Sequence, residues 1–156
     1  GDYHWRYLYS AEVNSIATYP LYGRGGCFKG FDGRSFSFNT NAEESLFERQ
    51  FDIYRRHFNS GVDCYAYVTL TTPDTDGLKA RMSRFVDRLQ AISANLPLRT
   101  VPLEILEWGP VHGRLTPARE QSLVLQQKAV EAWQEELTRR FPAGLREMAI
   151  SDVPLR

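Results

Sequence analysis

The chain has 156 residues, of which 42% are hydrophobic and 24% are charged, proportions typical of one globular domain. Its 19 basic and 19 acidic residues cancel, which argues against a nucleic-acid-binding protein, because phosphate recognition usually needs a basic excess or stripe. No apolar run reaches the ~18 residues that span a bilayer, and the first residues show no secretory signal. We therefore expect a cytoplasmic protein that binds neither nucleic acid nor a membrane.

The cysteines and histidines predict no metal site. Cys27 and Cys64 fall in apolar, strand-like stretches, which favours reduced, buried thiols over a disulfide framework. Two cysteines also exclude a zinc site of four cysteines. His4, His57 and His112 are scattered, and none has a second candidate ligand at motif spacing.

The chain divides into an aromatic-rich start and three strand–helix units. Residues 1–24 contain five tyrosines and one tryptophan, and we expect them to form an irregular segment with a packed or interface surface. Residues 25–156 alternate apolar stretches with helical patterns, as expected for a single α/β domain or half-domain.

The first unit begins with a short apolar strand at residues 26–28, closed by the sequence KGFDG. A helix is predicted over residues 41–61, with Asn41 as its N-cap and Gly61 as its C-terminal stop. Its apolar residues recur at helical spacing: Leu46, Phe47, Phe51, Tyr54 and Phe58.

The second unit begins with residues 62–72, VDCYAYVTLTT, which are rich in β-branched and aromatic residues and predict a buried strand. After the turn-like TPDTDG, residues 77–95 predict a helix. One face of this helix is apolar: Leu78, Met82, Phe85, Leu89 and Ile92.

The third unit begins with a strand over residues 98–106, in which Pro102 favours an edge position or an irregularity. Thr116 then caps a long helix with Pro117 at its first position, ending near Arg140. One side of this helix is predicted to be mainly apolar: Val124, Gln127, Ala129, Val130, Trp133 and Leu137. Residues 148–156 are a candidate for a last short strand.

Strands and helices that alternate at these lengths predict parallel β-α-β units. Three such units form either half of a six-unit barrel or a small three-layer sheet. In both folds, ligands bind beyond the carboxyl ends of the strands.

An ungapped series of short motifs spans the first unit: Lys29-Gly30, Phe36, Thr40-x-Ala42, Phe47-Glu48-x-Gln50 and Gly61-Val62, followed by DCYAYV. Over residues 27–68 this series resembles a segment of the radical SAM superfamily, in which the fourth strand ends in Lys-Gly and Gly-Val leads into the fifth. The resemblance implies the C-terminal half of a partial (β/α)6 barrel that binds S-adenosylmethionine. Family members cleave this cofactor to a 5′-deoxyadenosyl radical, which abstracts a substrate hydrogen.

The chain departs from this family in its cysteines. Family members hold a [4Fe–4S] cluster with three cysteines, usually spaced Cys-x-x-x-Cys-x-x-Cys, and thiolates must converge on one cluster. Cys27 and Cys64 lie 37 residues apart. We therefore expect that this chain does not bind the cluster and is not catalytic alone, and that a protein partner or a missing N-terminal half supplies it.

The resemblance implies that Lys29, Gly30, Thr69 and Thr71 bind S-adenosylmethionine. Gly30 would allow close approach of the backbone, and the two threonines share one face of their strand. The alternative is that Lys29 lies in solvent beside a β-α turn and that the threonines are ordinary strand residues.

Four further residues are candidates for substrate binding: Asp32, Glu104, Trp108 and His112. The alternatives are that Asp32 is a turn residue and that Glu104 pairs with Arg99. Glu104, Glu107 and His112 also suggest acid–base hydrolysis, but no serine or cysteine stands in a recognisable nucleophile elbow.

Two functions follow from these observations. The first is the C-terminal portion of a radical SAM enzyme, which contributes cofactor and substrate contacts to a cluster held elsewhere. The second is a non-catalytic interaction module that docks on a partner or self-associates as a homo-oligomer through an open sheet edge. Its contact surface would be Tyr3, Trp5, Tyr7 and Tyr9.

Overall fold

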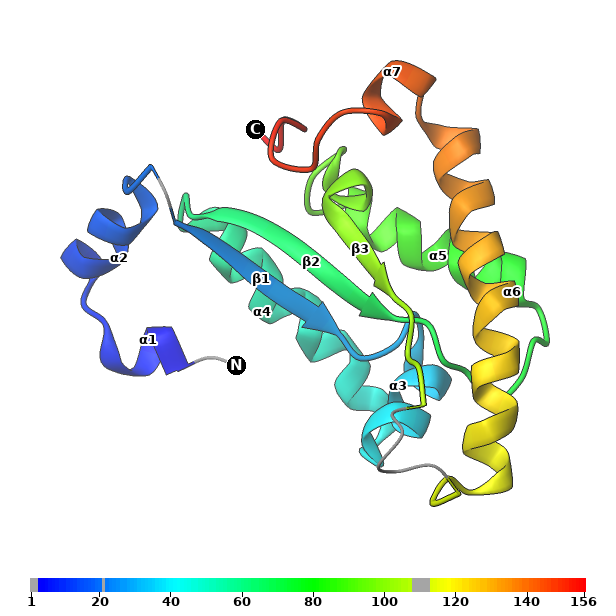
Figure 1. Cartoon of the computed structure of the whole chain (residues 1–156). Coiled ribbons are helices and arrows are strands. Elements are labelled where there is room, and N and C mark those ends of the chain that lie inside the picture. Colours follow the sequence, from blue (N-terminus) through cyan, green and yellow to red (C-terminus); the bar gives the residue numbers. More distant parts are fainter. Residues whose placement is uncertain (1–2, 21, 108–112) are drawn as a thin grey trace.

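The computed structural model describes residues 3–20, 22–107 and 113–156 and confirms an α/β fold with a parallel sheet. The three strands are β1 (Gly23–Phe28), β2 (Asp63–Thr69) and β3 (Thr100–Leu103). They lie in the order β1-β2-β3, and both pairs are parallel (Figure 1). The edge position expected from Pro102 is confirmed, because β3 pairs with β2 and with no other strand of the described residues.

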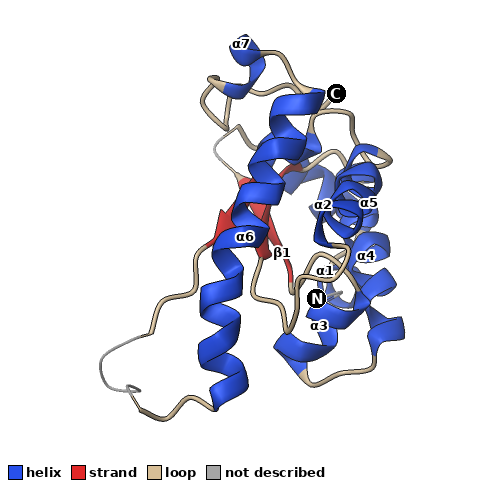
Figure 2. Ribbon diagram, turned by 90° about the vertical axis from the view of Figure 1, so that its right-hand side faces the viewer, coloured by secondary structure: helices blue, strands red, loops and turns tan. Residues whose placement is uncertain are grey.

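The two connecting helices cover one face of the sheet. Helix α4 (Phe47–Asn59) joins β1 to β2, and α5 (Leu78–Gln90) follows β2. Figures 1 and 2 show both helices on the same side of the strands. This arrangement is expected because successive β-α-β crossovers of the same hand place their helices on the same face. In the described part of the chain, no helix covers the opposite face (Figure 2).

The core lies between the sheet and these helices. The side chains of Cys64, Ala66 and Val68 alternate along β2 toward the helices and are fully buried. An aromatic cluster joins the elements: the ring of Phe28 on β1 lies 4.8 Å from that of Phe51 on α4. The cluster continues through Phe85 to Trp133, the largest fully buried side chain.

The predicted helix over residues 41–61 is wrong at its start. A separate helix, α3 (Gly33–Thr40), follows β1, and a 3-10 turn, η1 (Glu44–Leu46), precedes α4. Asp32 caps α3, since its carboxylate accepts a hydrogen bond from the Ser35 backbone N–H at 2.7 Å. Asn41 is the C-cap of α3 in a left-handed conformation, with φ of 57°. Asn41 suits either end of a helix, and the tertiary fold decides which.

The long helix α6 (Pro117–Arg140) follows its predicted bounds, with Thr116 as its N-cap. The predicted last strand is wrong. Residues 143–156 form a short helix, α7 (Ala143–Arg146), and turns. The end of the chain packs on the connection between α5 and β3, which contains the 3-10 turn η2 (Leu96–Arg99): Ser93 Oγ donates to the carbonyl of Leu155 at 2.8 Å.

The start of the chain is helical rather than irregular. It forms α1 (Tyr3–Tyr7) and α2 (Ser10–Ala17), which lie beside the β1 side of the sheet (Figure 1). The centroid of the Trp5 ring lies 5.3 Å from that of the His57 ring on α4. The Arg56 guanidinium carbon lies over the Trp5 ring, 4.5 Å from its centroid. Tertiary contacts of this kind stabilise helices that are too short to be stable alone.

Candidate functional site

A groove lies where the three strands end. Its volume is about 410 Å³, and its lining combines polar groups with an apolar wall. The residues that line it are Lys29, Asn39, Thr69, Thr71, Ile105, Leu106, Glu107, Leu115, Arg119, Ser122 and Leu123. Three of the four residues predicted to bind a cofactor, Lys29, Thr69 and Thr71, therefore lie at one cavity, although they come from two different units of the chain.

Lys29 is the residue after β1, and it is exposed. Its backbone N–H donates to Gln50 Oε1 at 2.8 Å, which fixes the end of the strand against α4. Among the described residues, its ammonium has no hydrogen bond or ion pair. The cation is therefore available to a ligand in the groove.

Gly30 is buried behind Lys29 and has φ of 152°. A Cβ atom there would lie 2.5 Å from the Phe36 backbone nitrogen. Gly30 allows α3 to pack against the end of β1, and it does not line the groove.

The two threonines differ in how they are held. Thr71 Oγ1 donates to Asn39 Oδ1 at 2.7 Å, and Asn39 Nδ2 donates to the Thr71 carbonyl at 3.0 Å. This reciprocal pair joins α3 to the chain beyond β2. The Thr69 hydroxyl has no such partner among the described residues, so it is available to a ligand.

The wall opposite Lys29 comes from the segment after β3 and from α6. Gln126 holds this segment with two hydrogen bonds: Ile105 N donates to its Oε1 at 2.8 Å, and its Nε2 donates to the Ile105 carbonyl at 3.2 Å. These two hydrogen bonds hold Ile105 and Leu106 at the surface, where they are 39% and 78% exposed. An apolar surface of this kind suits the flat face of a base or ring.

The α6 side of the groove also holds a cation that sequence reasoning missed. Arg119, in the first turn of α6, places its guanidinium 4.1 Å from the Phe38 ring centroid. No hydrogen bond or ion pair joins this guanidinium to another described residue. Glu107 also lines the groove, and its Oε1 accepts from the Gly113 N–H at 3.1 Å. Only the packing of α6 against α3 could reveal Arg119, because 90 residues separate it from Lys29.

Asp32 does not line the groove, and its contacts stabilise the fold. Besides capping α3, its carboxylate pairs with Arg81, which is 7% exposed. Arg81 also donates to Asp74 Oδ1 at 2.9 Å and to Thr72 Oγ1 at 3.2 Å. Burial alone raises the pKa of Asp32, but the hydrogen bonds from Arg81 and Ser35 outweigh it and hold the pKa below its usual value.

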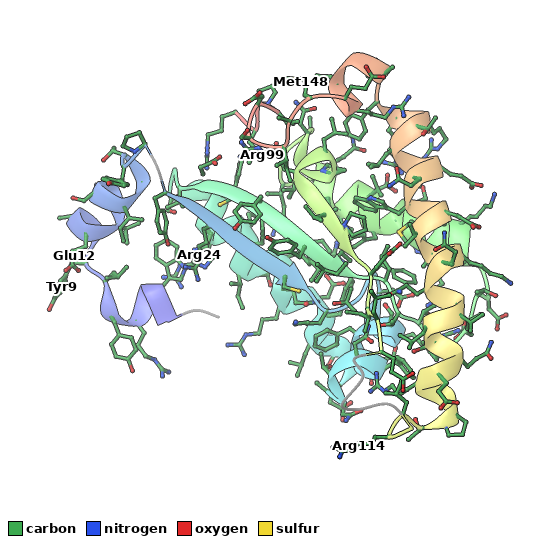
Figure 3. All side chains as sticks on the ribbon, in the orientation of Figure 1. Tyr9, Glu12, Arg24, Arg99, Arg114 and Met148 are labelled. Carbon is green, nitrogen blue, oxygen red and sulfur yellow. The ribbon has the colours of Figure 1, made fainter. Side chains whose placement is uncertain are left out.

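The other predicted substrate residues are not gathered at the groove. Glu104 is exposed after β3 and does not line it. The alternative pairing of Glu104 with Arg99 is wrong, because Arg99 pairs with Asp63 at the opposite ends of the strands. Figure 3 shows Arg24 and Arg99 at that end and Arg114 at the end where the strands point. Trp108 and His112 lie outside the described residues.

The sheet face without helices is lined by glycines and tyrosines. The Tyr65 ring lies against Gly25 of β1, where a Cβ would approach it to 3.1 Å, and packs edge-on against Tyr67 at 5.5 Å. The hydrogen bond with Tyr65 raises the pKa of Tyr67. Cys27 is exposed, so the prediction of two buried thiols is wrong for this residue; Cys64 is buried.

These thiols do not fit a cluster. Cys64 points to the helix-covered face of β2 and Cys27 does not, so the two do not converge. Among residues 3–20, 22–107 and 113–156, no three histidine, cysteine or acidic side chains gather as a metal site. The same residues include no helix with the length and apolarity required to cross a bilayer.

Comparison with models of known families, with curated proteins and with solved structures gives no match for this chain. The resemblance to the radical SAM superfamily therefore stays a prediction that rests on the motifs of residues 27–68.

Proposed function

We propose that the chain is the C-terminal portion of a radical SAM enzyme, and that it contributes S-adenosylmethionine and substrate contacts to a cluster held elsewhere. The observation that carries this proposal is the groove at the strand ends. There the Lys29 ammonium and the Thr69 hydroxyl, neither of which is paired with a described residue, lie at a cavity with an apolar wall. These groups suit S-adenosylmethionine: the cation complements its carboxylate, and the apolar wall complements its adenine.

In this proposal, the sheet is half of a (β/α)6 barrel. Three parallel strands with both connecting helices on one face are the arrangement that such a barrel repeats. The uncovered face, with Tyr65 and Tyr67, would line the interior, and β1 would pair with a strand of the other half.

The residues of this chain would bind and orient rather than react. Lys29 would hold the cofactor carboxylate, Thr69 would donate a hydrogen bond, and Ile105 and Leu106 would exclude water from the adenine. When bound, S-adenosylmethionine supplies the adenosyl group used by family members for hydrogen abstraction. The [4Fe–4S] cluster does not fit Cys27 and Cys64, so no step is assigned to it in this chain.

The test is to recover the protein from its native host without oxygen and to measure intact mass and iron. We expect a longer chain, or a bound partner with a cysteine triad, that carries about four irons per complex. A solitary chain of about 18.0 kDa without iron would overturn the proposal.

A substitution tests the role of Lys29 in that complete enzyme. Lys29→Ala should weaken S-adenosylmethionine binding by about tenfold, because one charge-assisted hydrogen bond is lost. Lys79→Ala, which removes a surface lysine paired with Glu135, is the matched control. Unchanged affinity in Lys29→Ala would remove this residue from the site.

The second candidate is an interaction module without catalysis. Two observations favour it. One edge of β1 pairs with no described strand, and the N-terminal residues Tyr7 and Tyr9 are 68% and 80% exposed. The Trp5 ring, by contrast, is in contact with Arg56 and His57. In sedimentation, a monomer whose behaviour is unaffected by deleting residues 1–10 would count against this candidate.

A further inference from the structure

We infer that the α6 side of the groove, built around Arg119, binds an anionic group of the substrate, so that the substrate is a carboxylate or a phosphate ester. The inference rests on the proposed function in one respect, that the groove is the ligand site. Anion binding at Arg119 requires neither the cluster nor the cofactor.

The first observation is that the groove holds two cations without partners. Lys29 follows β1 and Arg119 lies on α6, and neither side-chain cation has an ion pair or hydrogen bond within the described residues. Two like charges around one cavity of about 410 Å³ repel each other, and Glu107, the acid among the described lining residues, offsets at most one of them. The carboxylate of S-adenosylmethionine would pair with one of these cations. The other would then be available to an anionic group of the substrate.

The second observation is that Arg119 is held in place. Its guanidinium lies over the Phe38 ring at 4.1 Å, and its carbonyl accepts from the Ser122 hydroxyl at 2.7 Å. Stacking fixes the plane of the guanidinium while leaving its N–H groups free at the edges. A planar fork with free donors binds carboxylate and phosphate oxygens in pairs.

The third observation concerns the charge of the described lining residues and the hydrogen bonding of Glu107. Among the described lining residues, Glu107 is the one acid, and its carboxylate accepts from the Gly113 N–H. It offsets one of the two cations, so the described lining keeps a net positive charge. The positive end of the α6 dipole lies in the same turn as Arg119 and favours an anion further. The groove therefore selects an anionic substrate group over a neutral or cationic one.

The test is NMR titration of the 156-residue chain with inorganic phosphate and, separately, with malonate. We expect saturable shifts of the Thr69, Ser122 and Leu123 amides in the millimolar range. Arg119→Gln should raise the dissociation constant by about tenfold, and Arg119→Lys should recover part of the loss. The tighter of the two anions identifies the substrate group as phosphate or carboxylate.

The matched control is Arg56→Gln, which removes another stacked arginine, over Trp5 and outside the groove. It should leave both dissociation constants unchanged. Thermal unfolding checks that each variant is folded. If Arg119→Gln is unfolded, the dissociation constants of Arg119→Lys are compared with those of the original chain instead. The inference is overturned if neither anion saturates these amides, or if a folded Arg119 variant binds both anions as the original chain does.

A parallel titration with S-adenosylmethionine separates the two ideas. Cofactor binding that depends on Lys29, together with no anion site at Arg119, would overturn the inference and leave the proposed function intact. Anion binding at Arg119 without any cofactor binding by the complete enzyme would support the inference and reject the function.

Discussion

At the scale of single residues, Gly30 explains half of the Lys-Gly motif without any ligand. Its φ of 152° lies in a region that other residues rarely adopt, and an added Cβ would lie 2.5 Å from the Phe36 nitrogen. The glycine is therefore required for α3 to pack on β1, whereas no described residue forms an ion pair or hydrogen bond with the side-chain cation of the lysine before it.

Gly30→Ala should lower the free energy of unfolding by ~3 kcal/mol or more, because backbone strain and a steric clash add. Gly77→Ala is the control: its φ is 57°, but nothing lies within 4 Å of the added Cβ. It should cost only ~1 kcal/mol, from backbone strain alone. Urea unfolding of both variants measures the difference, and equal losses would contradict the clash.

The two cysteines should differ in reactivity, because only a thiolate that a reagent can reach will react. Cys27 is exposed, whereas burial raises the pKa of Cys64 to about 11. In the native protein, we expect a thiol reagent to modify Cys27 rapidly and Cys64 only after unfolding. Counting modified thiols by intact mass checks this, and Cys27→Ser should abolish the rapid phase. Two rapid phases would contradict the burial of Cys64.

At the scale of elements, Arg81 joins α3 to α5. It contacts the cap of α3 through Asp32 and the turn before α5 through Asp74, and it is itself buried. A buried arginine of this kind is costly without its partners, so the two carboxylates and Arg81 act as one unit. The unit sets where α3, and with it Asn39 and the end of β1, lies beside the groove.

This unit should make stability depend on pH on the acid side. The folded pKa of Asp32 is lowered, so its contribution is fully present above the ordinary value of 3.8 and is lost as pH falls through the folded pKa. Asp32→Asn keeps a capping residue but loses the ion pair, so it should lower stability at pH 7 by ~2 kcal/mol. Urea unfolding between pH 7 and pH 2 should show the two proteins converging on acidification; a constant difference would contradict the linkage.

Helix α6 shows how element-scale patterns mislead. Thr116 and Pro117 predicted its start, and its bounds are confirmed. Its buried residues are Ser122, Gln126, Ala129, Ala132 and Trp133, which confirms Ala129 and Trp133 of the predicted apolar side, whereas Val124 is 66% exposed. Two polar residues of α6 are buried because their side chains form hydrogen bonds with backbone groups. The Ser122 hydroxyl donates to the Arg119 carbonyl, and the Gln126 side-chain oxygen accepts from the Ile105 N–H. Hydrophobicity alone does not predict such positions.

At the scale of the molecule, the sheet is open at β1. Strand β2 is paired on both sides, whereas within the described ranges β1 pairs with β2 alone. A free edge of this kind is a template for another strand. Both functional candidates use this edge, one to complete a barrel and the other to bind a partner.

Hydrogen exchange should detect this open edge. In the 156-residue chain, β1 amides that do not donate to β2 should exchange rapidly, and amides of residues 66–68 in β2 should exchange slowly. In the complete protein recovered from its host, the rapid β1 amides should become protected. The same exchange in both samples would contradict strand addition at β1.

The sequence by itself determined the alternation of strands and helices, the long capped helix, and the gathering of Lys29, Thr69 and Thr71 at the strand ends. These follow from local periodicity and from the geometry of parallel strands, which brings carboxyl ends together. Only the tertiary structure decided that Asp32 binds Arg81, that Cys27 is exposed, and that Arg119 lines the groove. These depend on contacts between residues far apart in the chain, which local sequence patterns do not encode.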